Sequence, residues 1–391
     1  MMKKTLIALA AAAVAGGAYA QSAVTISGVV DINYGQVDGS GDAAARASDQ
    51  QRVGQNGSAT TAIIISGSED IGGGLRGIFR YEINPDFVSG DGFTAEVVGR
   101  ANGFHFVGLT GGFGEVRLGR LNSAFMQNWT TVVSPFGTNL GSGWGGAGVL
   151  NRYGAPTDNM TAPTRFNNAI EYQSPVFSGI QARLMYVPER DKASAAANRA
   201  RVVDAGLRFA QGPITAMLSW QQTSAKSTAG ILATASPIGV GGTGTAAAAD
   251  AAANFNDVDS TLWMLGGRYT MGALTLMGGY WQDQLEIAGV EVADISGWSL
   301  GATYRMGAWT FSGAYTQGED DSTARFFDDF VAVGGIDAGA ERTVLGLGVD
   351  YAFSKRTTLY GRFEDRNLDR PAVGAAQNEV RTIAVGIRHT F

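Results

Sequence analysis

VRTIAVGIRHTF (residues 380–391) ends the chain, and from Thr382 on two kinds of side chain alternate strictly. The odd-numbered positions from 383 on are Ile383, Val385, Ile387, His389 and Phe391. The even-numbered positions from 382 on hold small or polar residues and Arg388. Because successive side chains of a β-strand point to opposite faces, the pattern predicts a strand with one apolar face. Chain ends are usually frayed and polar, so an ending of this kind indicates that the last strand closes against the first.

One unit repeats along the chain: a strand of about ten residues, a short glycine-rich turn, a second strand and a longer polar loop. We predict sixteen strands, at 24–34, 60–68, 75–83, 104–110, 115–121, 164–174, 180–187, 201–210, 214–222, 260–270, 274–283, 295–305, 309–318, 342–353, 357–365 and 380–391. Short turns alternate with long loops, so all the short turns lie at one rim of the sheet. This asymmetry is typical of outer-membrane β-barrels.

The parity of the strands decides between a membrane barrel and a soluble fold. In 180–187 the even positions are apolar or aromatic, and Arg183 lies on the opposite face. In 164–174 we expect Phe166 to point outward and Glu171 inward. A soluble β-sandwich or propeller would have polar outer faces, and a dry barrel core would not hold so many charges. The sequence therefore predicts an all-β, antiparallel up-and-down transmembrane barrel with a wet interior.

The first twenty residues, MMKKTLIALAAAAVAGGAYA, have the layout of a secretory signal peptide. The apolar run between the two lysines and the small residues at the end is too short to span a bilayer. We expect cleavage before Gln21 and one barrel domain over residues 21–391. The net charge of −6 argues against nucleic acid as a partner, and the absence of cysteine excludes disulfides.

Several ordered motifs resemble those of the Gram-negative general porins, especially the betaproteobacterial and Neisseria-type group. They are GSEDIGGGL (67–75), FVGLTGGFGEVRLGR (106–120), NAIEYQSPVFSGI (168–180), YAFSKRTTLYG (351–361) and VGIRHTF (385–391). The resemblance implies a sixteen-stranded homotrimer in the outer membrane, surrounded by lipid and lipopolysaccharide. It also implies that a third loop folds inward to narrow the pore, and that Phe391 belongs to the signal by which such barrels are recognised for assembly.

The long segment at 122–162, between two expected strands, is the expected third loop. It contains SPFGTNLGSGWGG (134–146), and Pro135, Phe136 and Gly137 resemble the tip segment of the family, although the glutamate usual there is absent. No Asp or Glu occurs between Glu115 and Asp158. Unlike the third loop of cation-preferring porins, this loop would present no carboxylate to the pore.

Arginines are the expected partners of that loop. The resemblance places Arg120 and Arg165 on the wall opposite it, and parity adds Arg76 and Arg80 as further constriction residues. Strict parity turns Arg120 outward unless a bulge or strand end intervenes. Other residues expected to face the lumen are Asp31, Glu82, Glu171, Arg183 and Arg208. The basic wall is thinner than in relatives, because Ala62 and Ser66 stand where the family has Arg and Lys.

These features favour a channel for passive diffusion of ions and small hydrophilic solutes, with weak anion preference set by the lumen arginines. A substrate-specific porin that binds a sugar or an organic anion is the alternative, and a surface adhesin or structural barrel is a third class. Catalysis is not expected, because the chain has only two histidines, at 105 and 389. No cofactor is implied, and the acid pairs 320–321 and 328–329 could bind Ca²⁺ only incidentally.

Extending the chain beyond Phe391 tests the assembly hypothesis. Polar residues added after Phe391 should reduce insertion into the outer membrane while leaving the conductance of the inserted fraction unchanged. Insertion is measured by fractionation, and conductance by single-channel recording. Efficient assembly of the extended chain would count against the prediction.

Overall fold

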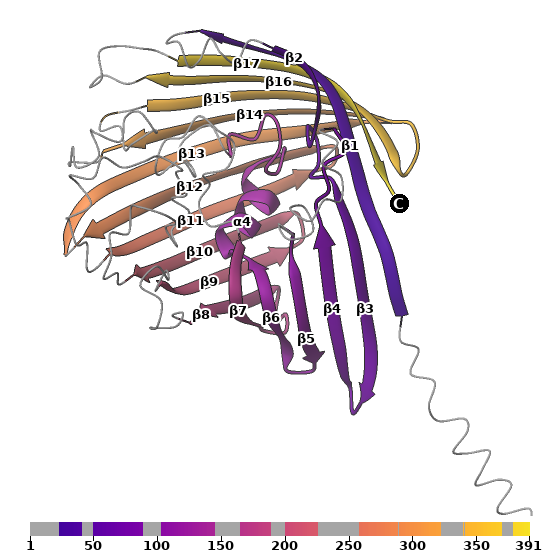
Figure 1. Ribbon diagram of the computed structural model, residues 1–391, viewed down its shortest axis with the longest axis vertical. Coiled ribbons are helices and arrows are strands. Elements are labelled where there is room, and N and C mark those ends of the chain that lie inside the picture. The colour runs from indigo at the N-terminus through magenta and orange to yellow at the C-terminus, as the bar shows by residue number, and fades with distance from the viewer. Residues whose placement is uncertain are drawn as a thin grey trace, which may run out of the picture.

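An antiparallel sheet that closes on itself forms the wall of the protein in a computed structural model (Figure 1). The structure describes residues 23–40, 50–88, 103–144, 165–188, 200–225, 258–287, 289–321, 339, 341–369 and 378–391. The expected signal peptide and the second half of the expected third loop lie outside these residues.

All sixteen predicted strands are present, and one further short strand accompanies them. The strands are β1 (Ala23–Ser40), β2 (Gln50–Gln55), β3 (Ala62–Gly72), β4 (Leu75–Ile83), β5 (His105–Gly111), β6 (Gly114–Asn122), β7 (Arg165–Gln173), β8 (Ile180–Val187), β9 (Ala200–Gln211), β10 (Ile214–Ala225), β11 (Val258–Met271), β12 (Leu274–Ile287), β13 (Val290–Met306), β14 (Trp309–Asp320), β15 (Glu341–Ala352), β16 (Thr357–Asp369) and β17 (Asn378–Thr390). β2 and β3 pair with successive halves of β1. The described strands therefore fill sixteen positions in the wall.

The last strand closes the sheet against the first, as predicted. β17 pairs with β1 from Val29↔Thr390 to Ser40↔Glu379, and Figure 1 places the C-terminus beside β1. Phe391 continues the ladder, because its N–H donates to Gly28 O and its carbonyl accepts from Gly28 N, both at 3.1 Å. Its ring covers Gly28, where a β-carbon would lie 2.6 Å from the ring Cζ. An aromatic residue thus completes the seam of the barrel.

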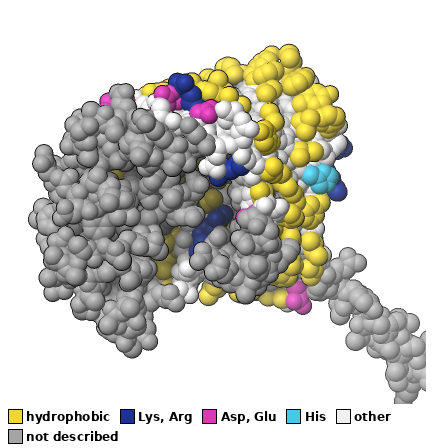
Figure 2. All heavy atoms as spheres, turned by 45° about the horizontal axis from the view of Figure 1, so that its top comes forward, with side chains coloured by type: hydrophobic (Ala, Val, Ile, Leu, Met, Phe, Trp, Pro, Cys, Tyr) yellow, Lys and Arg dark blue, Asp and Glu magenta, His cyan; other side chains and the backbone are white. Residues whose placement is uncertain are grey.

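The outer side of the wall is apolar, as the alternation predicts (Figure 2). In β17, Val385 is 60% exposed while its neighbour Ala384 is buried. Phe166 is an exception, and its predicted outward direction was wrong: it is buried against Leu121. The register between β6 and β7 shifts beside it, and Asn168 adopts a left-handed φ of 56°. This bulge reverses the alternation of β7.

Between β6 and β7 the chain forms two short helical turns, α4 (Ala124–Asn128) and the π-helix η1 (Trp129–Val133). Ser123 begins α4, and its hydroxyl accepts the N–H of Met126 at 3.0 Å. The apolar side chains of this segment pack on buried side chains of β10, β11 and β12. The members of this cluster are Phe125, Trp129, Val132, Val133, Trp144, Met217, Leu262, Met264 and Trp281. No helix in the described residues is long and apolar enough to cross a membrane.

Glycines on the inner side of the wall leave room for this segment. A β-carbon at Gly266 of β11 would lie 2.5 Å from Asn128 Oδ1, and one at Gly279 of β12 would lie 2.7 Å from Val133 Cγ2. A β-carbon at Gly301 of β13 would lie 2.7 Å from Pro135 Cδ. We call these three residues the inner-wall glycines. A side chain at any of them would displace the segment 123–144.

Gly301→Val should therefore displace this segment and lower the free energy of unfolding by about 1–3 kcal/mol through overpacking. The expected result is a lower melting temperature with an altered single-channel conductance. Gly313→Val on the neighbouring strand is the matched control, because its β-carbon would meet Leu347 Cδ2 at 3.6 Å and Gly346 O at 3.9 Å, both ordinary contacts. Equal behaviour of the two variants would contradict the prediction.

Candidate functional site

Three of the predicted lumen residues meet where β4 and β7 come close. The Glu82 carboxylate accepts a hydrogen bond from Arg80 Nη2 at 2.6 Å and lies 3.9 Å from Arg165 Nη2. Arg165 also donates to Asn122 Oδ1 at 2.9 Å. Glu82 is buried, whereas the Arg80 side chain keeps 30% of its surface exposed. Two positive charges, those of Arg80 and Arg165, therefore share one carboxylate.

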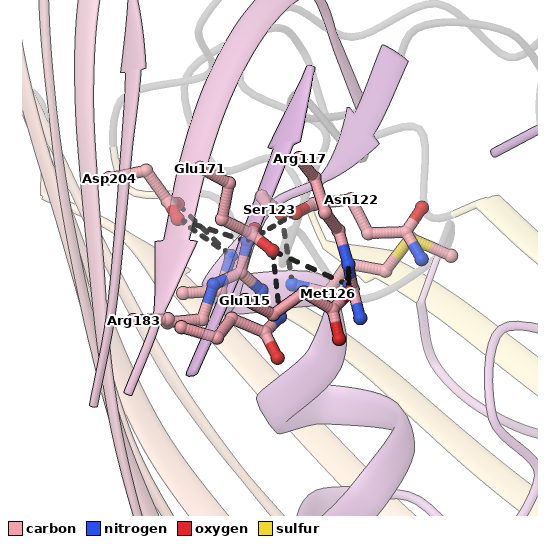
Figure 3. Close-up of polar contacts among 10 residues, drawn as sticks. Glu115, Arg117, Asn122, Ser123, Met126, Glu171, Arg183 and Asp204 are labelled. Carbon is pink, nitrogen blue, oxygen red and sulfur yellow. Dashed lines mark hydrogen bonds and ion pairs between the residues drawn. The ribbon is translucent and has the colours of Figure 1, made fainter. Parts of the chain in front are cut away.

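A second charged group holds the beginning of α4 (Figure 3). Arg183 forms ion pairs with Glu171 and, at 3.7 Å, with Asp204, and it donates to Asn122 O at 2.7 Å. Asp204 accepts the N–H of Ala124 at 3.0 Å, so it satisfies a backbone donor at the start of the helix. Both carboxylates are buried. We call this the Glu171 cluster.

Arg117 belongs to the same cluster, although sequence reasoning missed it. Its guanidinium pairs with Glu115 on its own strand and lies 3.5 Å from Glu171 on the next. Asp204 was missed as well. The signal was available for both, because Arg117 alternates with Leu118 in β6 and Asp204 alternates with Ala205 in β9.

The predicted loop tip lies on the opposite part of the wall from Arg165. Pro135 packs on Gly301, and Phe136 packs on Gly348 of β15, where a β-carbon would be 2.6 Å from the ring. Gly137 has a left-handed φ of 60°, and its carbonyl accepts Trp129 Nε1 at 2.8 Å. The tip therefore contacts β13 and β15 rather than β6 and β7.

Arg362 of β16 is the arginine that faces this tip. Its guanidinium carbon lies 5.5 Å from the centre of the Phe136 ring, a cation–π arrangement. It pairs with Asp350 at 3.0 Å and donates to Ser58 Oγ at 3.0 Å. Parity could have found it, because Tyr360, Arg362 and Glu364 alternate with less polar residues in β16.

Asp31, predicted to face the lumen, anchors the chain that follows β2. Its carboxylate accepts the N–H groups of Ser58 at 2.8 Å and Ala59 at 2.6 Å, together with the Tyr360 hydroxyl. Asp31 is fully buried. The carbonyl of Ser58 in turn accepts Asn139 Nδ2 at 3.3 Å. The turn after β2 therefore contacts the segment 123–144, which the sequence did not suggest.

The remaining predicted arginines are Arg76, Arg120 and Arg208. Arg120 is half-buried, its Nη1 donates to Asn167 Oδ1 at 2.7 Å, and its positive charge interacts with that of Arg165. Arg76 donates to Ser68 near the short turn. Arg208 lies on the inner side of β9, opposite Gln181.

Neither histidine belongs to a catalytic arrangement in the described residues. His105 stacks on Tyr81 with ring centres 4.6 Å apart, and His389 hydrogen-bonds Thr357 at 2.9 Å. Within the described ranges no group of three or more His, Asp or Glu side chains could hold a metal ion. The acid pair 328–329 lies outside those ranges.

A closed sheet with an apolar outer side and charged clusters inside is an outer-membrane β-barrel. The chain belongs to the Gram-negative porin family, whose model matches residues 5–370. This confirms the resemblance seen in the sequence motifs.

Among curated relatives, outer membrane porin protein 32 of Delftia acidovorans is 34% identical over 241 residues, 60% of this chain and 63% of that protein. Major outer membrane protein P.IB of Neisseria lactamica is 29% identical over 191 residues, 48% of this chain and 50% of that protein. The matched stretch thus spans less than two thirds of either relative. The relatives are porins, which are channel proteins rather than enzymes, and their place is the outer membrane.

Solved structures agree with the fold along nearly the whole chain. The anion-selective porin from Comamonas acidovorans is 25% identical with a TM-score of 0.67, covering 95% of this chain and all of that one. The trimer form of OmpT from Vibrio cholerae is 13% identical with a TM-score of 0.63, covering 95% and 99%. At 13% identity, the similarity to OmpT concerns the fold alone.

Removing Arg183 tests the Glu171 cluster. Arg183→Met should leave two buried carboxylates poorly compensated and lower the free energy of unfolding by about 3 kcal/mol. Urea unfolding in detergent micelles, followed by tryptophan fluorescence, measures this loss. Arg208→Met is the control, because in the described residues Arg208 shows no ion pair. A loss no larger than that of the control would contradict the assigned role.

Proposed function

We propose that the barrel is a water-filled outer-membrane channel for passive diffusion of ions and small hydrophilic solutes, with a weak preference for anions. The observation that carries the proposal is the charge of the segment 123–144: it contains no charged residue. On the inner wall, Arg80 and Arg165 share the single carboxylate of Glu82. The narrow part of the channel would then be lined by positive charge that the segment does not cancel.

Charge at the narrowest section matters more than the negative charge of the whole chain. Exposed charges separated by more than about 8 Å are largely screened at physiological ionic strength. Ions in the constriction have lost much of this screening, and rings of Arg or Lys there favour anions. We propose that the segment 123–144, seated on the inner-wall glycines, narrows the channel, with Pro135, Phe136 and Gly137 at its tip.

The surroundings of the channel are part of the proposal. We infer export by a cleaved signal peptide over residues 1–20, assembly through Phe391, and a homotrimer in contact with outer-membrane lipid and lipopolysaccharide. One relative of the fold is described as a trimer form, and another as anion-selective. These descriptions apply to those two proteins, and they support the homotrimer and the anion preference that we propose for this chain.

A binding porin for organic anions is a second candidate, favoured by aromatic rings beside the lumen arginines. The Arg80 guanidinium lies 5.6 Å from the centre of the Phe104 ring. That of Arg117 lies 4.8 Å from the Phe106 ring. A planar solute with a carboxylate could contact both the rings and the guanidinium groups. Saturation of transport at low solute concentration would favour this candidate.

Reversal potentials in planar bilayers under a salt gradient test the selectivity. We expect an anion-to-cation permeability ratio above one for the natural protein and a lower ratio for Arg165→Gln. Arg381→Gln is the control, because this half-exposed arginine pairs with Asp365 and Glu379 on the outer side of the wall. Clear cation preference of the natural protein would refute the proposed selectivity.

A further inference from the structure

Two arginines from neighbouring strands converge on one neutral oxygen inside the barrel. Arg362 Nη2 donates to Ser58 Oγ at 3.0 Å, and Arg388 Nη1 donates to the same atom at 2.8 Å. We call Ser58, Arg362 and Arg388 the Ser58 site. We propose that it binds the oxyanion group of a passing solute, a carboxylate or a phosphate. The inference rests on the proposed channel and identifies a place in it where such anions bind.

Of the two guanidinium charges at the site, one has a carboxylate in direct contact among the described residues and the other has none. Asp350 pairs with Arg362. Asp31 is opposite Arg388 in the register of β1 and β17, but its two oxygens accept the Tyr360 hydroxyl and two backbone N–H groups. Among the described carboxylates none lies within ion-pair distance of Arg388. The Arg388 guanidinium thus donates to a neutral hydroxyl in place of a carboxylate.

The site has an unused donor as well as unbalanced charge. Arg362 Nε is buried, and no described atom accepts a hydrogen bond from it. The Arg362 side chain is only 5% exposed, whereas Ser58 and Arg388 are half-buried. A solute can therefore reach the site from the side of Arg388, while Arg362 is held in place behind it.

The scaffold of the site is fixed by contacts that do not involve a solute. Asp31 holds the turn that carries Ser58, and Gly57 lies against Tyr360, where a β-carbon would be 2.6 Å from the hydroxyl oxygen. Asn139 joins the turn to the segment 123–144. Because these contacts fix the Ser58 oxygen, the two guanidinium groups are already positioned for an acceptor between them.

Two guanidinium groups select an oxyanion rather than a neutral sugar. Arginine presents planar N–H forks that match the oxygens of carboxylate and phosphate. A hydroxyl accepts hydrogen bonds from both groups without neutralising either charge. An arriving oxyanion would displace the Ser58 hydroxyl as acceptor, and its bonds to the guanidinium groups would join opposite charges, which a neutral hydroxyl cannot do.

Block of chloride current by inorganic phosphate in planar bilayers tests the inference. We expect phosphate to reduce the single-channel chloride current of the natural protein with saturation. Arg388→Gln should raise the half-blocking concentration by about tenfold or more, the effect of losing one charge-assisted bond. Arg305→Gln removes an equal charge from the inner side of β13 at the short-turn rim and should leave the block unchanged.

Ser58→Asp provides a second, independent readout that retains both arginines. Its carboxylate would occupy the position of the bound oxyanion and abolish the block, even if Arg388→Gln fails to fold. An anion-selective natural channel that phosphate does not block, or that phosphate blocks equally in Arg388→Gln and Arg305→Gln, would overturn the inference and leave the proposed function standing. Retained block in Ser58→Asp would also overturn it. A channel without anion preference would instead refute the proposed function.

Discussion

The close contact between the segment 123–144 and the inner-wall glycines is the constraint on which the interior of this barrel depends. At Gly266, Gly279 and Gly301 the backbone of the wall meets side chains of the segment where a β-carbon has no room. Apolar side chains then pack between the segment and β10, β11 and β12. The segment therefore lies on one part of the wall instead of hanging freely in the lumen.

Charged groups fix the two ends of this apolar contact. Near its beginning, Asp204 accepts the N–H of Ala124, and Arg183 holds Asp204 in turn. Near its other end, the Glu364 carboxylate accepts the N–H of Gly141 at 2.6 Å. Buried carboxylates are stable here because each has arginine or backbone N–H partners. Some arginines of the wall thus hold the segment, and we propose that others remain for passing anions.

Much of the wall could be predicted from alternation alone, since one apolar face in lipid and one polar face in water impose a period of two residues. Closure of β17 on β1, the outward face of 383, 385 and 387, and the grouping of Arg80 with Glu82 all follow from it. Phe166 could not be predicted, because the bulge at Asn168 depends on a local register shift.

The position of the loop tip could not be predicted from the alternation of side chains either. Which strands Phe136 contacts depends on where the wall lacks β-carbons, and a glycine in a strand gives no sign of its partner in a distant segment. Arg362 was visible as an inward residue, but its contact with the tip was not.

A disulfide between the segment and the wall tests the account most directly. The chain has no cysteine, and Val133 Cγ2, whose place a cysteine sulfur would take, lies 2.7 Å from the β-carbon position of Gly279. A covalent bond between the two positions would replace the overpacking that an unbonded side chain at Gly279 causes. In a Val133→Cys, Gly279→Cys double variant, we predict that oxidation of the folded protein consumes both thiols and leaves single-channel conductance unchanged. Free thiols in the folded protein, or a channel closed by the disulfide, would contradict the account.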